Sequence, residues 1–124
     1  MTQKYKGYIY IRFHESFEKY NAFKLGKTDN IPERENGYIT NEIKRGYFKY
    51  VYEIEWNYSI TLLEKLLHVE FKKFNIYIDG GTEFYHQDMI PLLEPYFIKN
   101  NIPYRLLHRP KIKMRQKRII SYKF

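Results

Sequence analysis

Alternating polar and apolar positions open the chain. From Gly7 to Phe13, Tyr8, Tyr10 and Arg12 share one face, while the residues between them are apolar. Successive side chains of a strand point to opposite faces, so this alternation predicts a β-strand with one apolar face. Ala22–Gly26 predicts a second short strand, antiparallel to the first.

The next stretch carries the signals of a helix followed by a strand. Thr28–Asn30 predicts a turn and a helix cap, and Pro32 fits the first helical turn, where its missing N–H does no harm. Gly37 is expected to end or interrupt that helix. Tyr47–Trp56 then predicts a third strand, because β-branched, aromatic and charged residues mix along it.

A single apolar stripe marks the strongest helix of the chain. Asn57 or Ser59 is expected to cap it. The stripe has spacings of three and four and consists of Ile60, Leu63, Leu67, Phe71 and Phe74. Such spacing places all five side chains on one helix face, which predicts a core position for this face.

The last third of the chain predicts a turn, a helix and a short strand. Asp79–Thr82 reads as a tight turn, followed by a helix from Glu83 to about Lys99. Pro91 and Pro95 would make that helix irregular, since each lacks a backbone donor. The segment "IPYRLLHRP" favours a short strand. Together these elements predict an α+β domain with a small three-stranded sheet, mixed or antiparallel, flanked by helices.

The charge distribution divides the chain in two. Of 22 Lys and Arg and 14 Asp and Glu, residues 1–102 hold 14 of each sign, so the net charge of +8 lies within residues 103–124. We therefore expect a domain at 1–102 and a basic C-terminal extension at 103–124. A polyanion such as DNA is its expected partner, and a solvated tail is the alternative. The extension residues expected to contact nucleic acid are Arg105, Arg109, Lys111, Lys113, Arg115, Lys117 and Arg118.

Several classes of site are excluded or weakened by the sequence. The chain has no cysteine, so disulfides and thiolate metal sites are excluded. No segment is long and apolar enough to span a membrane, and we expect an intracellular location, host cytoplasm or nucleus if the chain is viral. The phosphate-loop motif fails because Asn21 stands where its first glycine belongs. Glu64 and His68, four apart, could share a metal or form an exposed pair.

Four segments in order carry a resemblance to a nuclease family. They are "GYIYI" with Tyr10, "KLGKT" with Lys24, "NIPERENGY" with Arg34, and "GGTEFYH" with Glu83. This order resembles the GIY-YIG endonuclease superfamily, in the small branch found in phages and large DNA viruses. The resemblance covers roughly residues 7–98. Tyr8 stands where that superfamily usually has Gly, and Lys24 stands where most members have Tyr, although members of this branch place Lys there.

The resemblance implies a metal-dependent endonuclease that cuts DNA to leave a 5′-phosphate and a 3′-hydroxyl. Glu83 would hold Mg²⁺ or Mn²⁺, which accept carboxylate oxygens. Tyr10 would activate water, with Lys24 as the neighbouring ammonium that favours the phenolate. Arg34 would bind the scissile phosphate through its forked donors.

Other residues are expected to support this site. Tyr8 would back Tyr10 from the same strand face, and His86 would assist proton transfer or contact phosphate. Lys27 and Thr28, beside the second motif, are expected to touch the DNA backbone. Ordinary surface roles remain the alternative for each of them.

Two other functions stay open. One is a nucleic-acid-binding module of the same fold without turnover, and the other is a protein-interaction domain with a solvated tail. A homodimer or a targeting partner protein is compatible with the small size of the chain.

Overall fold

The computed structural model describes residues 5–41, 46–56, 59–78 and 80–108, which form an α+β domain. The strands are β1 (Tyr5–Phe13), β2 (Ala22–Thr28), β3 (Tyr47–Trp56), β4 (Asn75–Ile78), β5 (Gly81–His86) and β6 (Tyr104–His108). The helices are α1 (Glu15–Glu18), α2 (Ile31–Asn41), α3 (Ile60–Glu70) and α4 (Ile90–Lys99), with 3-10 turns at Lys72–Phe74 and Gln87–Met89.

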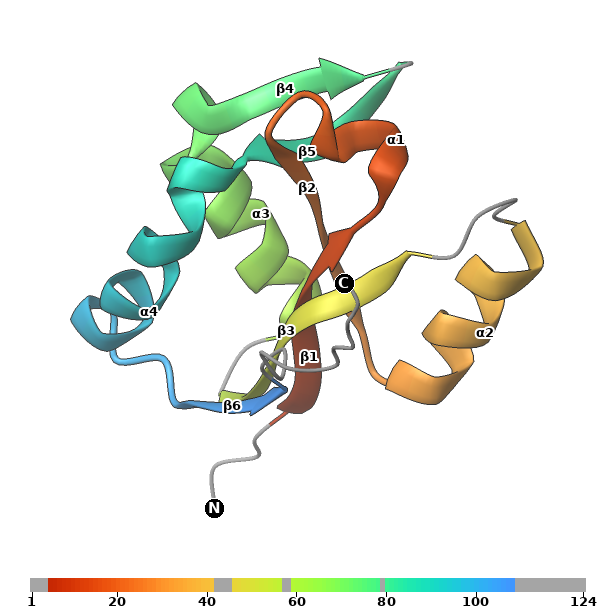
Figure 1. Ribbon diagram of the computed structural model, residues 1–124. Coiled ribbons are helices and arrows are strands. Elements are labelled where there is room, and N and C mark those ends of the chain that lie inside the picture. Colours follow the sequence, from red (N-terminus) through yellow and green to blue (C-terminus); the bar gives the residue numbers. More distant parts are fainter. Residues whose placement is uncertain (1–4, 42–45, 57–58, 79, 109–124) are drawn as a thin grey trace.

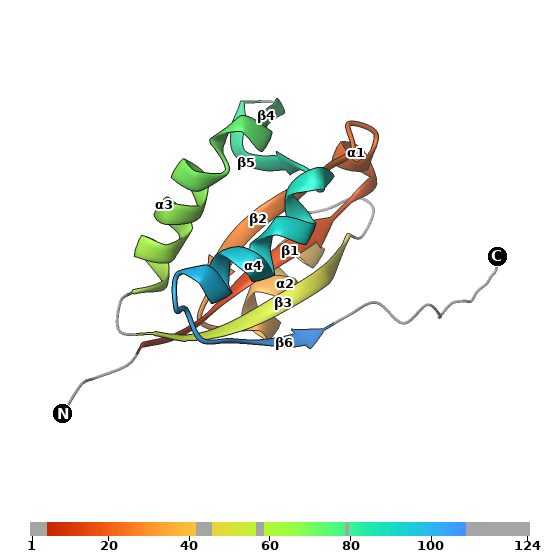
Figure 2. The same ribbon diagram turned by 90° about the vertical axis from the view of Figure 1, so that its left-hand side faces the viewer.

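The strands form one open sheet in the order β4-β5-β2-β1-β3-β6, and all of the described pairings are antiparallel. The α+β class with flanking helices is confirmed, whereas the expectation of three strands was wrong. Helices α3 and α4 cover one face of the sheet, and α2 lies against the opposite face (Figures 1 and 2).

The alternation along β1 explains how both faces are filled. Ile9, Ile11 and Phe13 lie in the main core beneath α3 and α4. Tyr10 points to the other face, where it packs in a smaller cluster with Phe48 and Val51. The predicted division of this strand into two faces is therefore confirmed, but its polar face is also largely buried.

Helix α3 forms as its apolar stripe predicts. The Ser59 hydroxyl accepts a hydrogen bond from the Leu62 N–H at 3.2 Å and so caps the helix. Leu63, Leu67 and Phe71 are buried in the main core. The stripe anchors the helix against the sheet and leaves its polar side at the sheet edge.

A β-bulge in β3 brings Phe48 to the face of α2. Ile11 pairs with Tyr50, but Arg12 pairs with Phe48, so Lys49 is an extra residue in the ladder. Phe48 and Val51 are three positions apart and would otherwise lie on opposite faces. The bulge therefore allows both side chains to join the cluster around Tyr10.

The segment after residue 80 departs from the prediction. Glu83 lies in strand β5 and does not begin a helix, and α4 starts only at Ile90, with Pro91 in its first turn. Gly80 has a φ of 80°, a left-handed conformation that suits the reversal between β4 and β5. The aromatic pair after Glu83 then pairs with β2 rather than continuing into a helix.

Two further expectations have clear outcomes. Helix α2 continues through Gly37, so this glycine neither ends nor interrupts it. The predicted C-terminal strand is confirmed as β6, which pairs with β3 and extends the sheet to His108. The basic residues from Arg109 onward lie outside the described residues. Within the described ranges, no helix has the length and apolar character needed to cross a membrane.

Candidate active site

Four predicted residues from different elements meet at one polar pocket. Strand β5 pairs with β2 only as far as Lys24 in the described residues, so the rest of β2 borders the pocket. The polar pocket has a volume of about 270 Å³. Its lining consists of Tyr10, Lys24, Arg34 and Glu83, which the sequence predicted, together with Gly26, Lys27, Tyr38 and Glu64.

Tyr10 is held by a cross-strand glycine. Its side chain is only 2% exposed, and it pairs across the ladder with Gly26. A Cβ atom at position 26 would lie 2.3 Å from the Tyr10 hydroxyl oxygen, so only glycine leaves room for the ring. The glycine of the second motif therefore has a steric function that places the Tyr10 hydroxyl in the pocket.

Tyr38 is the immediate partner of Tyr10. Their hydroxyl groups share a hydrogen bond of 2.7 Å, and their rings meet edge to face. The Arg12 guanidinium lies 4.0 Å from the centre of the Tyr38 ring, and the Arg12 side chain is fully buried. A buried cation over an aromatic face is a strong contact, so Arg12 fixes the ring that in turn holds Tyr10.

Lys24 and Glu83 form an ion pair at the pocket. Their Nζ and Oε1 atoms are 3.4 Å apart, and the Lys24 ammonium also lies 4.9 Å from the Tyr38 ring centre. The Lys24 side chain is mostly buried, whereas that of Glu83 is half exposed. The two residues that sequence motifs placed far apart are therefore direct neighbours.

Glu64 adds a second carboxylate to the pocket, whereas the sequence analysis considered it only together with His68. It is half-buried and lines the polar pocket, so Glu64 and His68 are not the exposed pair that was expected. His68 instead shares a hydrogen bond of 2.6 Å with the Tyr85 hydroxyl. Burial raises the pKa of Glu64, the Lys27 charge opposes this, and the nearby Glu83 carboxylate raises it further.

Burial also decides the protonation of Tyr10. It raises the pKa of the Tyr10 phenol well above its ordinary value, and the hydrogen bond with Tyr38 adds to this. The charges of Arg34 and Lys24 lower the pKa but do not outweigh burial. Tyr10 is therefore neutral at physiological pH in the free protein, although Lys24 favours the phenolate in the expected direction.

The two carboxylates fit a hard divalent cation. The Glu83 carboxylate raises the pKa of Glu64 at the pocket, and a cation between the two carboxylates would relieve this repulsion. Carboxylate oxygens with remaining water positions suit Mg²⁺ or Mn²⁺. No group of three or more His, Asp or Glu residues arranged for a metal occurs among the described residues. Any cation here would therefore keep several waters.

The T5orf172 domain, a phage-associated family related to GIY-YIG and HNH-like nucleases, matches residues 7–94, more than half of the chain. The chain belongs to the T5orf172 domain family. No curated protein and no solved structure gives a significant match. Membership agrees with a nuclease-like or DNA-binding role, while the closer GIY-YIG assignment stays a prediction.

The matched T5orf172 segment contains all of the described residues that line the polar pocket. It also contains Tyr8 and His86, which the structure places elsewhere. Tyr8 lines a separate pocket on the same face of the sheet. His86 lies on β5, accepts a hydrogen bond from the Asp88 N–H and has the Asp88 carboxylate 3.5 Å away. Because β5 is a strand, His86 and Glu83 point to opposite faces.

The other described residues that were predicted to contact nucleic acid lie in different parts of the molecule. Lys27 lines the polar pocket. Thr28 makes local turn hydrogen bonds with Asn30. Arg105 lies on β6 and donates a 2.8 Å hydrogen bond to Glu53 at the surface. Their proposed DNA contacts remain predictions.

Sequence reasoning missed Tyr38 and Arg12 as parts of this site, and it considered Glu64 only as a partner of His68. A signal for Tyr38 was present, since it stands four residues after Arg34 and therefore on the same helix face. Glu64 lies on the polar side of the α3 stripe, and no local pattern indicates that it reaches Glu83. Its role depends on the sheet edge that α3 crosses.

Proposed function

We propose that the polar pocket binds a phosphodiester of DNA and hydrolyses it with the help of a divalent cation. The observation that carries this proposal is the convergence at one pocket of three cationic side chains, two carboxylates and two hydrogen-bonded tyrosine hydroxyls. Phosphodiester hydrolysis needs this combination, because it must neutralise phosphate charge, hold a cation and place a water.

The basic side chains bind the phosphate. Arg34 projects from α2 and Lys27 from β2, so they approach the pocket from two elements. Guanidinium groups bind phosphate through two parallel hydrogen bonds, and an ammonium adds a point charge. Lys24 keeps Glu83 in place through their ion pair and remains close enough to contribute positive charge.

The carboxylates of Glu64 and Glu83 hold Mg²⁺ or Mn²⁺. When bound, the cation supplies Lewis-acid stabilisation of the phosphate oxygens and lowers the pKa of nearby oxygen acids. Glu64 comes from a helix and Glu83 from a strand, so they reach the pocket from separate elements. This arrangement gives the role of metal ligand to two acids, whereas the sequence predicted Glu83 alone.

Tyr10 places the attacking water and receives its proton. The phenol is neutral before the reaction, and its hydroxyl oxygen accepts the water proton as its own proton moves to the Tyr38 oxygen along their hydrogen bond, while Tyr38 releases its proton to solvent. Water oxygen attacks phosphorus, the bond to the 3′ oxygen breaks, and that oxygen takes up a proton from solvent as it leaves. The products are a 5′-phosphate and a 3′-hydroxyl.

A plasmid assay tests this function. Purified protein is incubated with supercoiled plasmid in Mg²⁺, in Mn²⁺ and in EDTA, and nicked circles are quantified. We expect cleavage that depends on the cation and is lost in Glu83→Gln and Arg34→Ala. Glu70→Gln is the matched control, because Glu70 is an exposed acid on α3 outside the pocket lining. Binding without nicking in either metal would instead support a nucleic-acid-binding module without turnover.

A further inference from the structure

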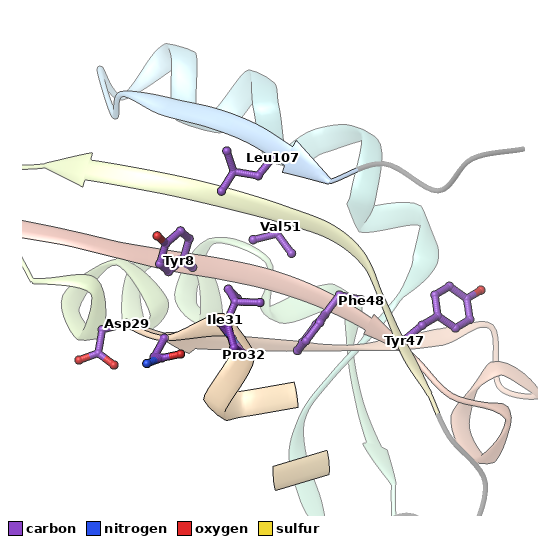
Figure 3. A pocket seen from close by; sticks show the side chains of 9 residues that line it. Tyr8, Asp29, Ile31, Pro32, Tyr47, Phe48, Val51 and Leu107 are labelled. Carbon is purple, nitrogen blue, oxygen red and sulfur yellow. The ribbon is translucent and has the colours of Figure 1, made fainter. Parts of the chain in front are cut away.

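A second pocket lies beside the polar pocket on the face of the sheet that carries α2. This aromatic pocket has a volume of about 580 Å³, within the size range of small-molecule sites. Side chains from β1, β3, β6 and the start of α2 surround it (Figure 3). Those used below are Tyr8, Ile31, Phe48, Val51 and Leu107.

The aromatic pocket has the opposite chemistry to the polar pocket. No Lys or Arg is among the described residues that line it, and its only charged group is the Asp29 carboxylate at the rim. A phosphate would be repelled here, since no cation compensates its charge. A flat apolar group with polar edges fits better, because its faces can contact aromatic and aliphatic side chains while its edges reach Asp29 and Asn30.

The two pockets meet at Phe48, whose ring contacts both Tyr10 and Tyr38. The rings of Tyr10 and Phe48 lie 5.0 Å apart, with Tyr10 lining the polar pocket and Phe48 the aromatic pocket. Tyr8 and Tyr10 stand two residues apart on one face of β1, a separation of about 7 Å along a strand. This is comparable to the span of one nucleotide along a nucleic-acid strand.

We infer that the aromatic pocket binds an unpaired nucleobase of the nucleotide next to the phosphate in the polar pocket. This inference rests on the proposed function for the position of the phosphate. It names the substrate class, which is single-stranded DNA or DNA with a locally unpaired nucleotide. Tyr8 is the stacking residue, and Phe48 and Val51 form the floor.

The requirement for an unpaired base follows from the shape of the site. In a duplex, each base is covered on both faces by its neighbours, so a base must leave the stack before a protein ring can contact its face. Stacking on an aromatic side chain then replaces part of the lost base stacking. A phosphate pocket beside a base pocket therefore favours strands in which the base is already unstacked, because binding then does not include the free-energy cost of unstacking it.

The test measures binding in EDTA, where no cleavage occurs. Fluorescence anisotropy compares a single-stranded oligonucleotide with a strand of equal length built from abasic residues, which keeps every phosphate. We expect Tyr8→Ala to weaken binding to the first strand by about 5- to 100-fold, the range for loss of one stacked base. Binding to the abasic strand and to blunt duplex should stay unchanged.

Matched variants separate stacking from folding. Tyr8→Phe keeps the ring and should restore the affinity. Tyr77→Ala removes an exposed tyrosine from β4, outside the aromatic pocket, and should have no effect. With the unmodified protein, an oligonucleotide containing 2-aminopurine should lose fluorescence on binding, since stacking quenches this base, and this readout requires no variant.

The outcomes distinguish this inference from the proposed function. Equal affinity for the base-containing and abasic strands, with no quenching, would overturn the base site and leave phosphate hydrolysis untouched. Base-dependent binding together with absence of nicking would support the base site and overturn only the hydrolysis. If Leu107→Asp abolished self-association without changing DNA affinity, the pocket would be a contact between two copies of the chain, and the inference would be wrong.

Discussion

The polar pocket and the aromatic pocket share one wall but differ in almost every chemical property. The polar pocket gathers ionised groups around the Tyr10 hydroxyl, whereas the aromatic pocket has mainly apolar side chains around Phe48. The Tyr10 ring contacts Phe48 with one side while its hydroxyl bonds Tyr38. Tyr10 therefore lies between a surface suited to phosphate and a surface suited to a base.

This difference shows how a small domain can contact both parts of a nucleotide without a separate specificity domain. Tyr8 and Tyr10 follow each other on the same face of β1, so the strand itself sets the spacing of the two pockets. If the two pockets act separately, variants in one pocket should leave the function of the other intact.

The largest effect is expected for Gly26→Ala. The new Cβ would collide with the buried Tyr10 ring, which cannot move without displacing Tyr38 and Phe48. We expect nicking to fall by about 100-fold, because a displacement of about 1 Å at the chemical site has this effect. The free energy of unfolding should fall by about 1–3 kcal/mol, the cost of overpacking.

Gly37→Ala is the control for this change. No atom lies within 4 Å of its added Cβ, and the residue is inside helix α2. The variant should be more stable by about 0.5–1 kcal/mol, because alanine suits a helix better than glycine. Urea unfolding and the plasmid assay measure both variants. Normal nicking in Gly26→Ala would contradict the position assigned to Tyr10 at the chemical site.

Glu64→Gln should strongly reduce nicking while preserving the base site. Activity is expected to fall by roughly 100-fold, because a cation at the phosphate contributes several kcal/mol to the transition state. Binding to single-stranded DNA in EDTA should be unchanged or stronger, since one negative charge is removed. Equal loss of nicking and of base-dependent binding would contradict the separation of the pockets.

The same variant makes a stability prediction with a defined sign. Because the pKa of Glu64 is raised in the folded protein, its ionised form destabilises the fold as pH rises through the range between the unfolded and folded pKa values. Without metal at neutral pH, Glu64→Gln should therefore show a small increase in Tm. At pH 3, where both states are protonated, the difference should disappear. Thermal unfolding monitored by circular dichroism measures both.

Tyr38→Phe should have a moderate effect that depends on pH. The hydrogen bond with Tyr38 contributes to the raised pKa of Tyr10, so its removal should let Tyr10 ionise at lower pH than in the unmodified protein. The Tyr10 pKa should remain above its ordinary value, because burial is the main cause. Ultraviolet titration and the pH profile of nicking should shift in the same direction. An unchanged profile would exclude a proton transfer through this pair.

Tyr8→Phe is expected to have the smallest effect of these substitutions on DNA binding and nicking. It keeps the ring that faces the aromatic pocket and removes only the hydroxyl, so base-dependent affinity should change by less than about 2-fold if stacking dominates. Nicking of supercoiled plasmid should be unaffected, since Tyr8 does not line the polar pocket. A large loss of nicking would return Tyr8 to the catalytic group in which the sequence placed it.

The sequence predicted the four residues that define the polar pocket because each stands in a short, ordered motif. Tyr10, Lys24 and Arg34 lie on elements that were correctly assigned, so their convergence could be expected. Glu83 was correctly predicted as a site residue, but it was assigned to the start of a helix and lies in strand β5. A strand and a helix start are hard to distinguish after a turn.

Other parts of the fold depend on contacts between distant segments. Strand β4 has only four residues and carries no clear alternation, so its sheet partner defines it. Glu64 is one of two acids on α3, and its location depends on how that helix crosses the edge of β2. The aromatic pocket arises from four elements together, including β6, which no local pattern near Tyr8 reveals.

The extra residue in β3 affects how this chain should be aligned with others. Phe48 faces the same side as Val51 only because Lys49 is accommodated without a partner opposite it. In a relative that lacks this insertion, the equivalent aromatic would stand two positions before the valine instead of three. An alignment without a gap would therefore match Phe48 with a residue from the opposite face. The relative would then seem to lack the aromatic residue between the two pockets although it has one.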